Sequence, residues 1–212
     1  MANPAEKDPF PGENGRRRRL SAAERRAQIV EAAQAVFLEQ GLTGARTRDI
    51  TERAGITEPF FYRFFASKEE IYDEAVLRPL HELIVGLKER AERLAVEPDG
   101  QGRQGLEEVN AVLLEFMQQA APFLAVVLFA ELRKGKAFYQ GEIYRQLRDC
   151  IVNLLNQLSA GKMAAFDPDI VFDTMFGLHL GVAIDHMLRG RTLDVAQTAR
   201  DVTAIHAFGV SG

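Results

Sequence analysis

The segment that most constrains the fold is residues 47–64, where a single glycine separates two short helical stretches. Ile50 and Ala54 are four residues apart, so they lie on one face of the first stretch. Gly55 follows, and glycine adopts the left-handed backbone of a tight turn without steric cost. Thr57 then caps a second short helix, whose first turn tolerates Pro59. The pattern predicts a helix-turn-helix, in which one short helix braces another at a steep angle.

The flanking sequence predicts a helix on each side of this motif. Ser21 and Glu24 form a capping box, and apolar residues then recur at helical spacing from Ile29 until Gly41, a plausible stop. A second capping box, Ser67 with Glu70, opens a longer helix that Pro79 should kink or split. We therefore predict an N-terminal three-helix domain over residues 16–68.

The rest of the chain also predicts helices. We expect them over residues 106–120, 122–133, 138–159, 168–189 and 193–208. No segment shows the apolar–polar alternation of a half-buried strand. The predicted fold class is all-α, with a second helical domain over residues 69–212. Residues 1–15 are rich in proline and glycine and are interpreted as a disordered tail.

Charge is distributed unevenly along the chain. Residues 16–68 carry a net charge of +5, whereas residues 69–212 carry −7, within a total of −4. A basic module on an acidic body favours contact with a polyanion at one end. A short helix fits the major groove of DNA, so the motif and the charge point to DNA. The block from Arg16 to Arg19 is either an arm that lies along the DNA or a run of solvated charges with no fixed target. Arg25 and Arg26 are either simple surface charges or part of the basic surface that meets DNA.

Composition narrows the class of protein further. Cys150 is the one cysteine, so no intramolecular disulfide forms, and its apolar surroundings indicate a buried inert thiol. No apolar run reaches the roughly 20 residues that span a bilayer, and no signal peptide is evident. These features predict a cytoplasmic protein with no membrane partner. No phosphate-binding loop, nucleophile elbow or HExxH motif is present, so we expect no cofactor and no enzyme activity.

A metal site is also not expected. His179 and His186 lie seven residues apart on nearly one helix face. That spacing is about 10 Å along a helix, too far for two imidazoles to share one ion without a bend.

Residues 47–70 read TRDITERAGITEPFFYRFFASKEE, and Ile29–Ala33 and Phe37 to Gly41 precede them. Together these elements resemble, in order and spacing, the DNA-binding signature of the tetracycline-repressor (TetR) family. The resemblance implies that Tyr62 and Lys68 contact DNA phosphates and that Thr47 caps the second helix. It implies that Thr57, Glu58 and Phe60 face the bases. The candidate DNA-binding residues are Arg18, Arg19, Arg46, Thr47, Thr57, Glu58, Phe60, Phe61, Tyr62, Arg63 and Lys68.

Two of these residues depart from the family pattern. Glu58 is acidic where a neutral or basic residue is frequent, and a carboxylate near phosphates is unfavourable unless it accepts from a cytosine amino group. Phe60 replaces a small residue, and its ring either contacts thymine methyl groups or packs inward.

The second half of the chain is rich in phenylalanine and methionine, which suit a helical core and also an adaptable ligand pocket. Resemblance to the family implies a pocket for a small hydrophobic or aromatic effector. The candidate effector-binding residues are Phe116, Phe129, Phe172, Phe176 and His179. The family also implies a homodimer through residues 168–189 and 193–208, where Gly177 and Gly181 would let helices approach closely.

The sequence therefore predicts a homodimeric, ligand-responsive regulator of transcription. Its effector would release it, as a repressor, from a palindromic operator in double-stranded DNA. An activator or a constitutive repressor of the same fold is one alternative. A helical ligand-binding or adaptor protein that no longer reads DNA is another, with Glu58 and Phe60 as its supporting features.

Overall fold

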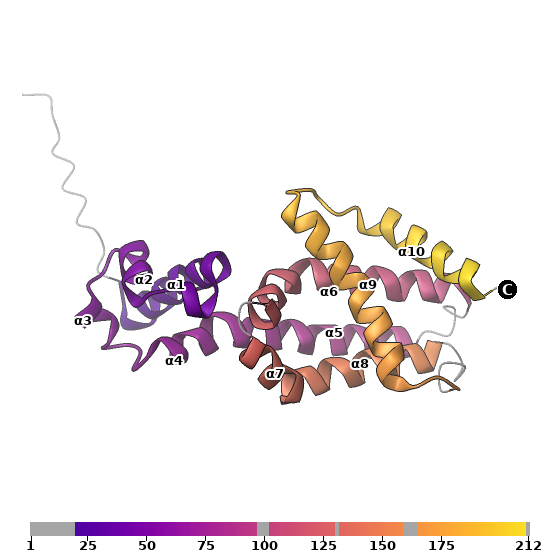
Figure 1. Cartoon of the computed structure of the whole chain (residues 1–212), viewed down its shortest axis with the longest axis horizontal. Helices are drawn as coiled ribbons and strands as arrows, with labels where there is room; N and C mark the ends of the chain where they lie inside the picture. Colours follow the sequence, from indigo (N-terminus) through magenta and orange to yellow (C-terminus); the bar gives the residue numbers. More distant parts are fainter. Residues whose placement is uncertain (1–19, 97–101, 130–131, 159–164, 211–212) are drawn as a thin grey trace, which may run out of the picture.

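The computed structural model describes residues 20–96, 102–129, 132–158 and 165–210. Every regular element in these ranges is a helix, which confirms the all-α prediction. Figure 1 shows α1 to α4 gathered at one end of an elongated molecule and α5 to α10 at the other. The predicted tail, Arg18 and Arg19 lie outside the described residues.

The N-terminal end contains α1 (Ala22–Gly44), α2 (Thr47–Ala54), α3 (Glu58–Phe61) and α4 (Lys68–Tyr72). The predicted capping box at the start of α1 is confirmed, because Ser21 Oγ accepts from the Glu24 backbone N–H and Glu24 accepts from the Ser21 N–H. Gly41 interrupts α1 with a positive φ of 69°, so the regular helix ends where the sequence predicted. At α4 the second capping box is only half formed, since the Glu70 carboxylate accepts from the Ala66 N–H and not from Ser67.

The turn between α2 and α3 has the predicted geometry. Gly55 lies in the left-handed region, with φ 65° and ψ 38°. The Ile56 N–H then donates to the Thr51 carbonyl, which closes the turn. Ile50 and Ala54 are buried beneath it, as the helical spacing required.

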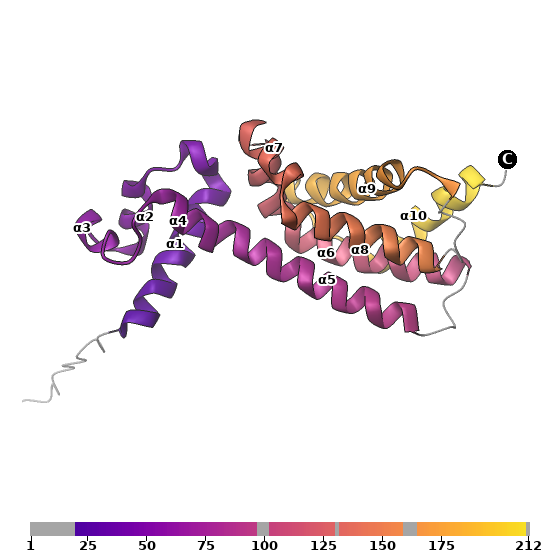
Figure 2. The ribbon, with the colours of Figure 1, turned by 90° about the horizontal axis from the view of Figure 1, so that it is seen from below.

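A continuous run of helix leads from the N-terminal end of the molecule to the other end, and α1 also contacts α6. After α4 comes a π-helical turn, η1 (Asp73–Leu77), and then α5 (Arg78–Val96). Figure 2 shows these elements running on from one another out of the N-terminal end. The helix continues from α4 into α5 without a break at Pro79, and the irregularity near the proline is the π turn that precedes it. Pro79 has no N–H for the carbonyl four residues earlier, at Ala75. The Gln34 amide of α1 donates to that carbonyl at 3.0 Å.

The other end is built around α6 (Arg103–Phe129), which packs against α5, α9 and α10. Its remaining helices are α7 (Leu132–Gln140), α8 (Glu142–Leu158), α9 (Pro168–Leu188) and α10 (Val195–Val210). The prediction of a break between residues 120 and 122 is wrong, because α6 continues through Pro122. Buried Ala120, Ala121 and Leu124 hold the helix together there, and their packing offsets the hydrogen bond that proline removes.

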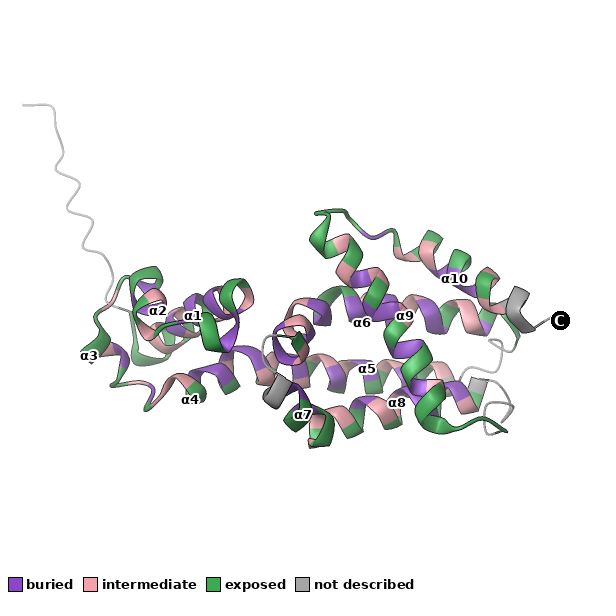
Figure 3. Cartoon of the chain, in the orientation of Figure 1, coloured by how far each residue is buried: buried purple, intermediate pink, exposed green. Residues whose placement is uncertain are grey.

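The distribution of buried residues follows the packing of the helices. Figure 3 shows buried residues where helices face one another and exposed residues on their outer faces. Among the described residues, α6 alone is long and apolar enough by composition to cross a membrane, but 56% of its most apolar window is buried inside the protein. That is the pattern of a core helix.

Candidate DNA-binding surface and effector pocket

The N-terminal end presents α3 and the turn after it to solvent. Thr57, Glu58 and Arg63 are exposed, and the Tyr62 side chain is 52% exposed. Thr57 occupies the N-cap position of α3, but its hydroxyl makes no bond to the helix, contrary to the predicted cap. The Tyr62 hydroxyl has no hydrogen-bond partner among the described residues. These groups therefore face outward with donors and acceptors that the fold itself does not use.

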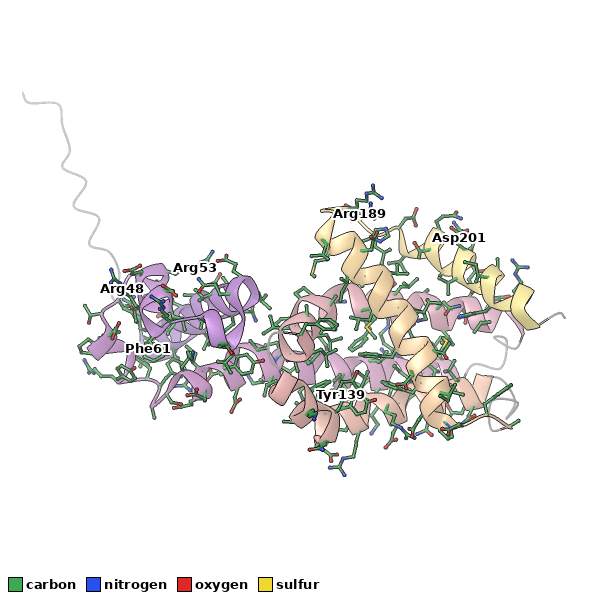
Figure 4. All side chains as sticks on the ribbon, viewed as in Figure 1. Arg48, Arg53, Phe61, Tyr139, Arg189 and Asp201 are labelled. Atoms are coloured by element: carbon green, nitrogen blue, oxygen red, sulfur yellow. The ribbon has the colours of Figure 1, made fainter. Side chains whose placement is uncertain are left out.

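Phe60 and Phe61 differ although they are neighbours. Phe61 is 0% exposed and packs 5.5 Å from Phe65, so its side chain belongs to the core rather than to the surface on which it was predicted. Figure 4 labels it within the N-terminal end. Phe60 is half-buried, with its ring 5.3 Å from Phe64 and the Arg63 guanidinium 5.4 Å from its centroid. The Phe60 ring was expected either to contact thymine methyl groups or to pack inward, and part of it packs against Phe64.

Thr47 and Lys68 have structural roles besides those that the family implies. Thr47 is the first residue of α2, and Arg46 occupies the cap position, with its N–H donating to Asp49 Oδ2 at 3.1 Å. The predicted Thr47 cap is therefore wrong by one residue. Lys68 Nζ donates to the Leu42 and Ala45 carbonyls at 2.8 and 2.9 Å. Two of its three N–H groups thus brace the end of α1, which leaves one for a phosphate.

Charges beside α3 are paired along the helix surface. Arg48 Nε donates to Glu52 at 2.7 Å, and this bond, followed by the attraction of Glu52, raises the pKa of Arg48. Glu58 contributes a weaker attraction to the same guanidinium. An arginine close to Glu58 lowers the repulsion that its carboxylate would meet near phosphates. Arg46 is exposed at the start of α2.

The predicted effector residues do not form one cavity. Phe172 and Phe176 are buried and stack at 5.1 Å in an aromatic cluster with Tyr144, which lies 5.4 Å from Phe172. Burial raises the pKa of Tyr144 to about 12, with nearby Asp173 adding to the shift. Phe129, in contrast, is 68% exposed at the end of α6.

His179 lies in a buried polar network that joins three helices. Its Nδ1 lies 2.6 Å from the Met175 carbonyl, and its Nε2 lies 3.0 Å from the Asn110 side chain. The Asn110 amide lies 2.8 Å from the Thr203 hydroxyl of α10. Burial lowers the pKa of His179 to about 4, so the imidazole is neutral at pH 7. The network fixes α9 and α10 on α6.

Two grooves flank α5. The larger, about 740 Å³, lies between α5 and α8 and includes Cys150, whose pKa burial raises to about 11. The other, about 660 Å³, lies between α5 and α6, with Leu83, Leu87 and Phe116 among its apolar walls and Arg90 and Arg93 at its edge. Of the predicted effector residues, only Phe116 lines either groove.

Within the described ranges, no three His, Cys, Asp or Glu side chains gather closely enough to hold a metal ion. His186 Nδ1 lies 3.0 Å from the Val182 carbonyl of its own helix. The two histidines considered for a metal site thus each have a partner on α9.

The helix-turn-helix end also matches a known family. Residues 29–75, from α1 through η1, match the model of the bacterial regulatory proteins of the tetR family. The helix-turn-helix end of this chain is therefore of the TetR type. Its TetR-type segment contains the Gly55 turn, Tyr62 and Lys68 described above. In solved structures, the same arrangement of helices recurs in the regulator FadR of Bacillus subtilis in complex with stearoyl-CoA, at 17% identity and a TM-score of 0.60, with 84% of this chain and 96% of that chain covered.

Two curated relatives are similar to part of the chain. The transcriptional activator FasR of Mycolicibacterium smegmatis is 32% identical over 107 residues, which is 50% of this chain and 47% of FasR. The transcriptional repressor KstR2 of Mycobacterium tuberculosis is 48% identical over 50 residues, 24% of this chain and 25% of KstR2. This chain therefore spans about half the length of FasR and a quarter of KstR2.

Proposed function

We propose that this protein is a homodimeric regulator of the TetR family that binds an operator in double-stranded DNA and is released from it by a small hydrophobic effector. Residues 16–68 would bind DNA, and residues 69–212 would bind the effector and form the dimer. The observation that carries the proposal is the exposed surface of α3, where Thr57 and Tyr62 present polar groups that the fold does not use. Such a protein would work in the cytoplasm, where the DNA is.

DNA binding would divide between phosphate and base contacts. Tyr62, Lys68 and Arg46 would donate to phosphates, which fix the position of the protein without reading sequence. Thr57 and Glu58, at the start of α3, would face base edges, with Glu58 accepting from a cytosine amino group.

The dimer would form through α9. Its exposed face carries Ile170, Gly177, Gly181 and Leu188, of which Ile170 is 61% and Leu188 76% exposed. A Cβ added at either glycine would meet nothing within 4 Å, so the packing of one chain does not require glycine there. Glycine inside a helix costs about 1 kcal/mol relative to alanine. Close approach of a second helix offsets that cost, which supports a two-fold interface at this face.

The dimer proposal has a direct test in Gly181→Leu. Within one chain the new side chain has open space and favours the helix, so each protomer should stay folded. Across the interface it would separate the helices and weaken dimerisation by at least about 100-fold, or about 3 kcal/mol. Sedimentation at several concentrations measures this, with Gly86→Leu, which has similar open space on α5, as the matched control. A Gly181→Leu dimer as tight as the wild type would remove α9 from the interface.

The effector would bind in the groove between α5 and α6. Apolar Leu83, Leu87 and Phe116 suit an acyl or aromatic group. Arg93 suits an anionic end, whereas Arg90 is paired with Glu115 and the groove also includes Glu82 and Glu89. The likeness in fold to FadR, which was solved with stearoyl-CoA, supports an amphipathic anion of this kind. Binding would release DNA by favouring protomer positions in which the two α3 helices no longer match the operator.

Stearoyl-CoA, palmitate and benzoate are the first probes of the effector site. We expect at least one of the first two to weaken operator binding, and Phe116→Ser to remove that response while operator affinity without ligand stays unchanged. Leu128→Ser, on the same helix but outside the groove, is the control. If no probe weakens operator binding, the released-repressor mechanism fails and a constitutive regulator remains. Expression of a reporter with and without the protein distinguishes repression from activation.

A further inference from the structure

Arg26 is the best-connected polar side chain at the N-terminal end. It lies on α1 and is only 38% exposed. Its Nη1 donates to the Phe64 carbonyl at 2.7 Å, in the turn that follows α3. Its Nη2 and Nε donate to the two carboxylate oxygens of Glu74 at 2.5 and 3.3 Å. One guanidinium therefore joins α1, the segment after α3, and η1.

The ring of Phe65 adds a further contact. The Arg26 Cζ lies 4.2 Å from the Phe65 ring centroid, close enough for a cation–π interaction. Phe65 in turn packs on Phe61, the last residue of α3. The planar guanidinium thus fixes both the backbone and the side chains at the end of α3.

Glu74 connects this arrangement to the link between the two ends of the molecule. It is 17% exposed, lies within η1, and also accepts from Arg78, the first residue of α5, at 3.3 Å. Gln34, two turns further along α1, donates to Ala75 in the same η1. The π turn is thereby bonded to α1 at two places, on the side where Pro79 leaves a carbonyl without its usual donor.

We infer that Arg26 is a positioning residue for DNA recognition: it sets the orientation of α3 relative to η1 and α5 through Phe64 and Glu74. This inference rests on the proposed function. The bonds of the Arg26 guanidinium are made to groups of the protein itself. Its removal should therefore affect the recognition of a particular operator more than the attraction of the protein to DNA in general, because base contacts need exact orientation and phosphate attraction does not.

The test compares Arg26→Gln with Arg53→Gln on two duplexes, the operator selected by the wild-type protein and an unrelated sequence. Arg53 is labelled in Figure 4; it makes an ion pair at 2.8 Å with Glu39 and joins α2 to α1 without contacting the end of α3. Both variants lose one positive charge, so salt-dependent attraction falls equally. We expect Arg26→Gln to weaken operator binding by at least about tenfold more than Arg53→Gln, with equal small losses on the unrelated duplex.

Two further variants keep the inference testable if Arg26→Gln folds poorly. Arg26→Lys keeps the charge, but an ammonium cannot bond Phe64 and Glu74 in a fixed fork while stacking on Phe65. It should lose an intermediate part of the preference for the operator. Glu74→Gln should cause part of the loss, because Arg26 keeps its bond to Phe64, and the double variant with Arg26→Gln should lose little more than Arg26→Gln alone, because their shared interaction is then already absent.

The outcomes separate the inference from the proposed function. Thermal unfolding and the dimer fraction are measured for each variant, so that affinities refer to folded dimers. If wild-type protein prefers an operator and Arg26→Gln and Arg26→Lys change both duplexes by the same factor as Arg53→Gln, Arg26 is not a positioning residue. If wild-type protein prefers no duplex, the proposed function and this inference fail together.

Discussion

The two ends of the molecule are held together in different ways. At the N-terminal end, side chains from one helix donate to backbone carbonyls of another: Lys68 to Leu42 and Ala45, Gln28 to Ala54, and Arg26 to Phe64. At the other end, long helices pack through apolar side chains, and the buried network of Asn110, His179 and Thr203 joins α6, α9 and α10, while the polar pairs between other helices lie at the surface.

The difference follows from helix length. Three of the N-terminal helices, α2, α3 and α4, have only four to eight residues, bury little apolar area and are marginal alone, so directional hydrogen bonds must fix them on the longer α1. At the other end every helix except α7 has 16 to 27 residues, and such helices bury enough apolar area to pack without such bonds. Directional bonds suit an end that must match DNA closely, whereas aliphatic and aromatic packing adjusts more readily to a ligand.

The largest expected effect follows from removing the hydrogen bonds that Lys68 donates to the end of α1. Lys68→Ala removes two charge-assisted hydrogen bonds and should lower the free energy of unfolding by about 3 kcal/mol. The control is Arg90→Ala, which removes an ion pair with the Glu115 of α6 at about 40% exposure and should cost less than about 1 kcal/mol. Urea unfolding measures both. Equal losses would mean that the two ends do not differ in how they are held.

The next prediction concerns pH and tests the network at the other end. The pKa of His179 is lowered to about 4 by burial, below the 6.5 of the unfolded chain. The unfolded state therefore binds the proton first as the pH falls, so this stabilisation is present above pH 6.5 and is lost on going from pH 6.5 toward pH 4. We expect a loss of about 2 kcal/mol between pH 7 and pH 5.

His179→Gln is the matched variant for this prediction, because it keeps a polar side chain at the position and removes the titration. Its free energy of unfolding should change less over the same pH range. His206, whose pKa burial also lowers, contributes in the same direction and stays in both proteins. An unchanged pH slope in His179→Gln would show that His179 does not titrate as its burial requires.

The helix-turn-helix end could be predicted closely from the sequence, because its signals are local. Gly55, the Ser21 capping box and the stop at Gly41 each act within a few residues, and each has the expected geometry. The buried position of Phe61 was missed, since five aromatic residues lie within residues 60–65 and spacing does not show which of them face inward. Arg26 was also missed, although it lies three residues before Ile29, on the stripe that carries Ala33 and Phe37 into the core.

The other end was harder to predict. Helix existence follows from apolar periodicity, but continuity through Pro122 depends on packing that is set by distant segments. The effector residues were chosen for their chemistry, and chemistry alone does not distinguish a ring that lines a groove from one in a filled core. Phe116 lines the groove beside α5, whereas Phe172 and Phe176 pack on each other. Contact between an effector and any of these three residues stays a prediction.

The smallest expected effect separates phosphate contacts from base contacts at the N-terminal end. Tyr62→Phe removes one exposed hydroxyl and should weaken binding to every duplex by about fivefold, or about 1 kcal/mol. Glu58→Ala should change the preferred base instead, because the carboxylate would accept from a base edge. Binding of both variants to a panel of single-base operator variants measures this. A change of preferred base in Tyr62→Phe would reverse the two assigned roles.

The most direct test of the central claim is selection of duplexes from a random DNA library by the purified full-length protein, followed by titration of the winner against salt. We predict a palindromic winner bound by a dimer, with affinity that falls steeply as salt rises. A folded dimer that enriches no sequence, and whose weak binding is the same for every duplex, would contradict the account and favour a ligand-binding protein of the same fold.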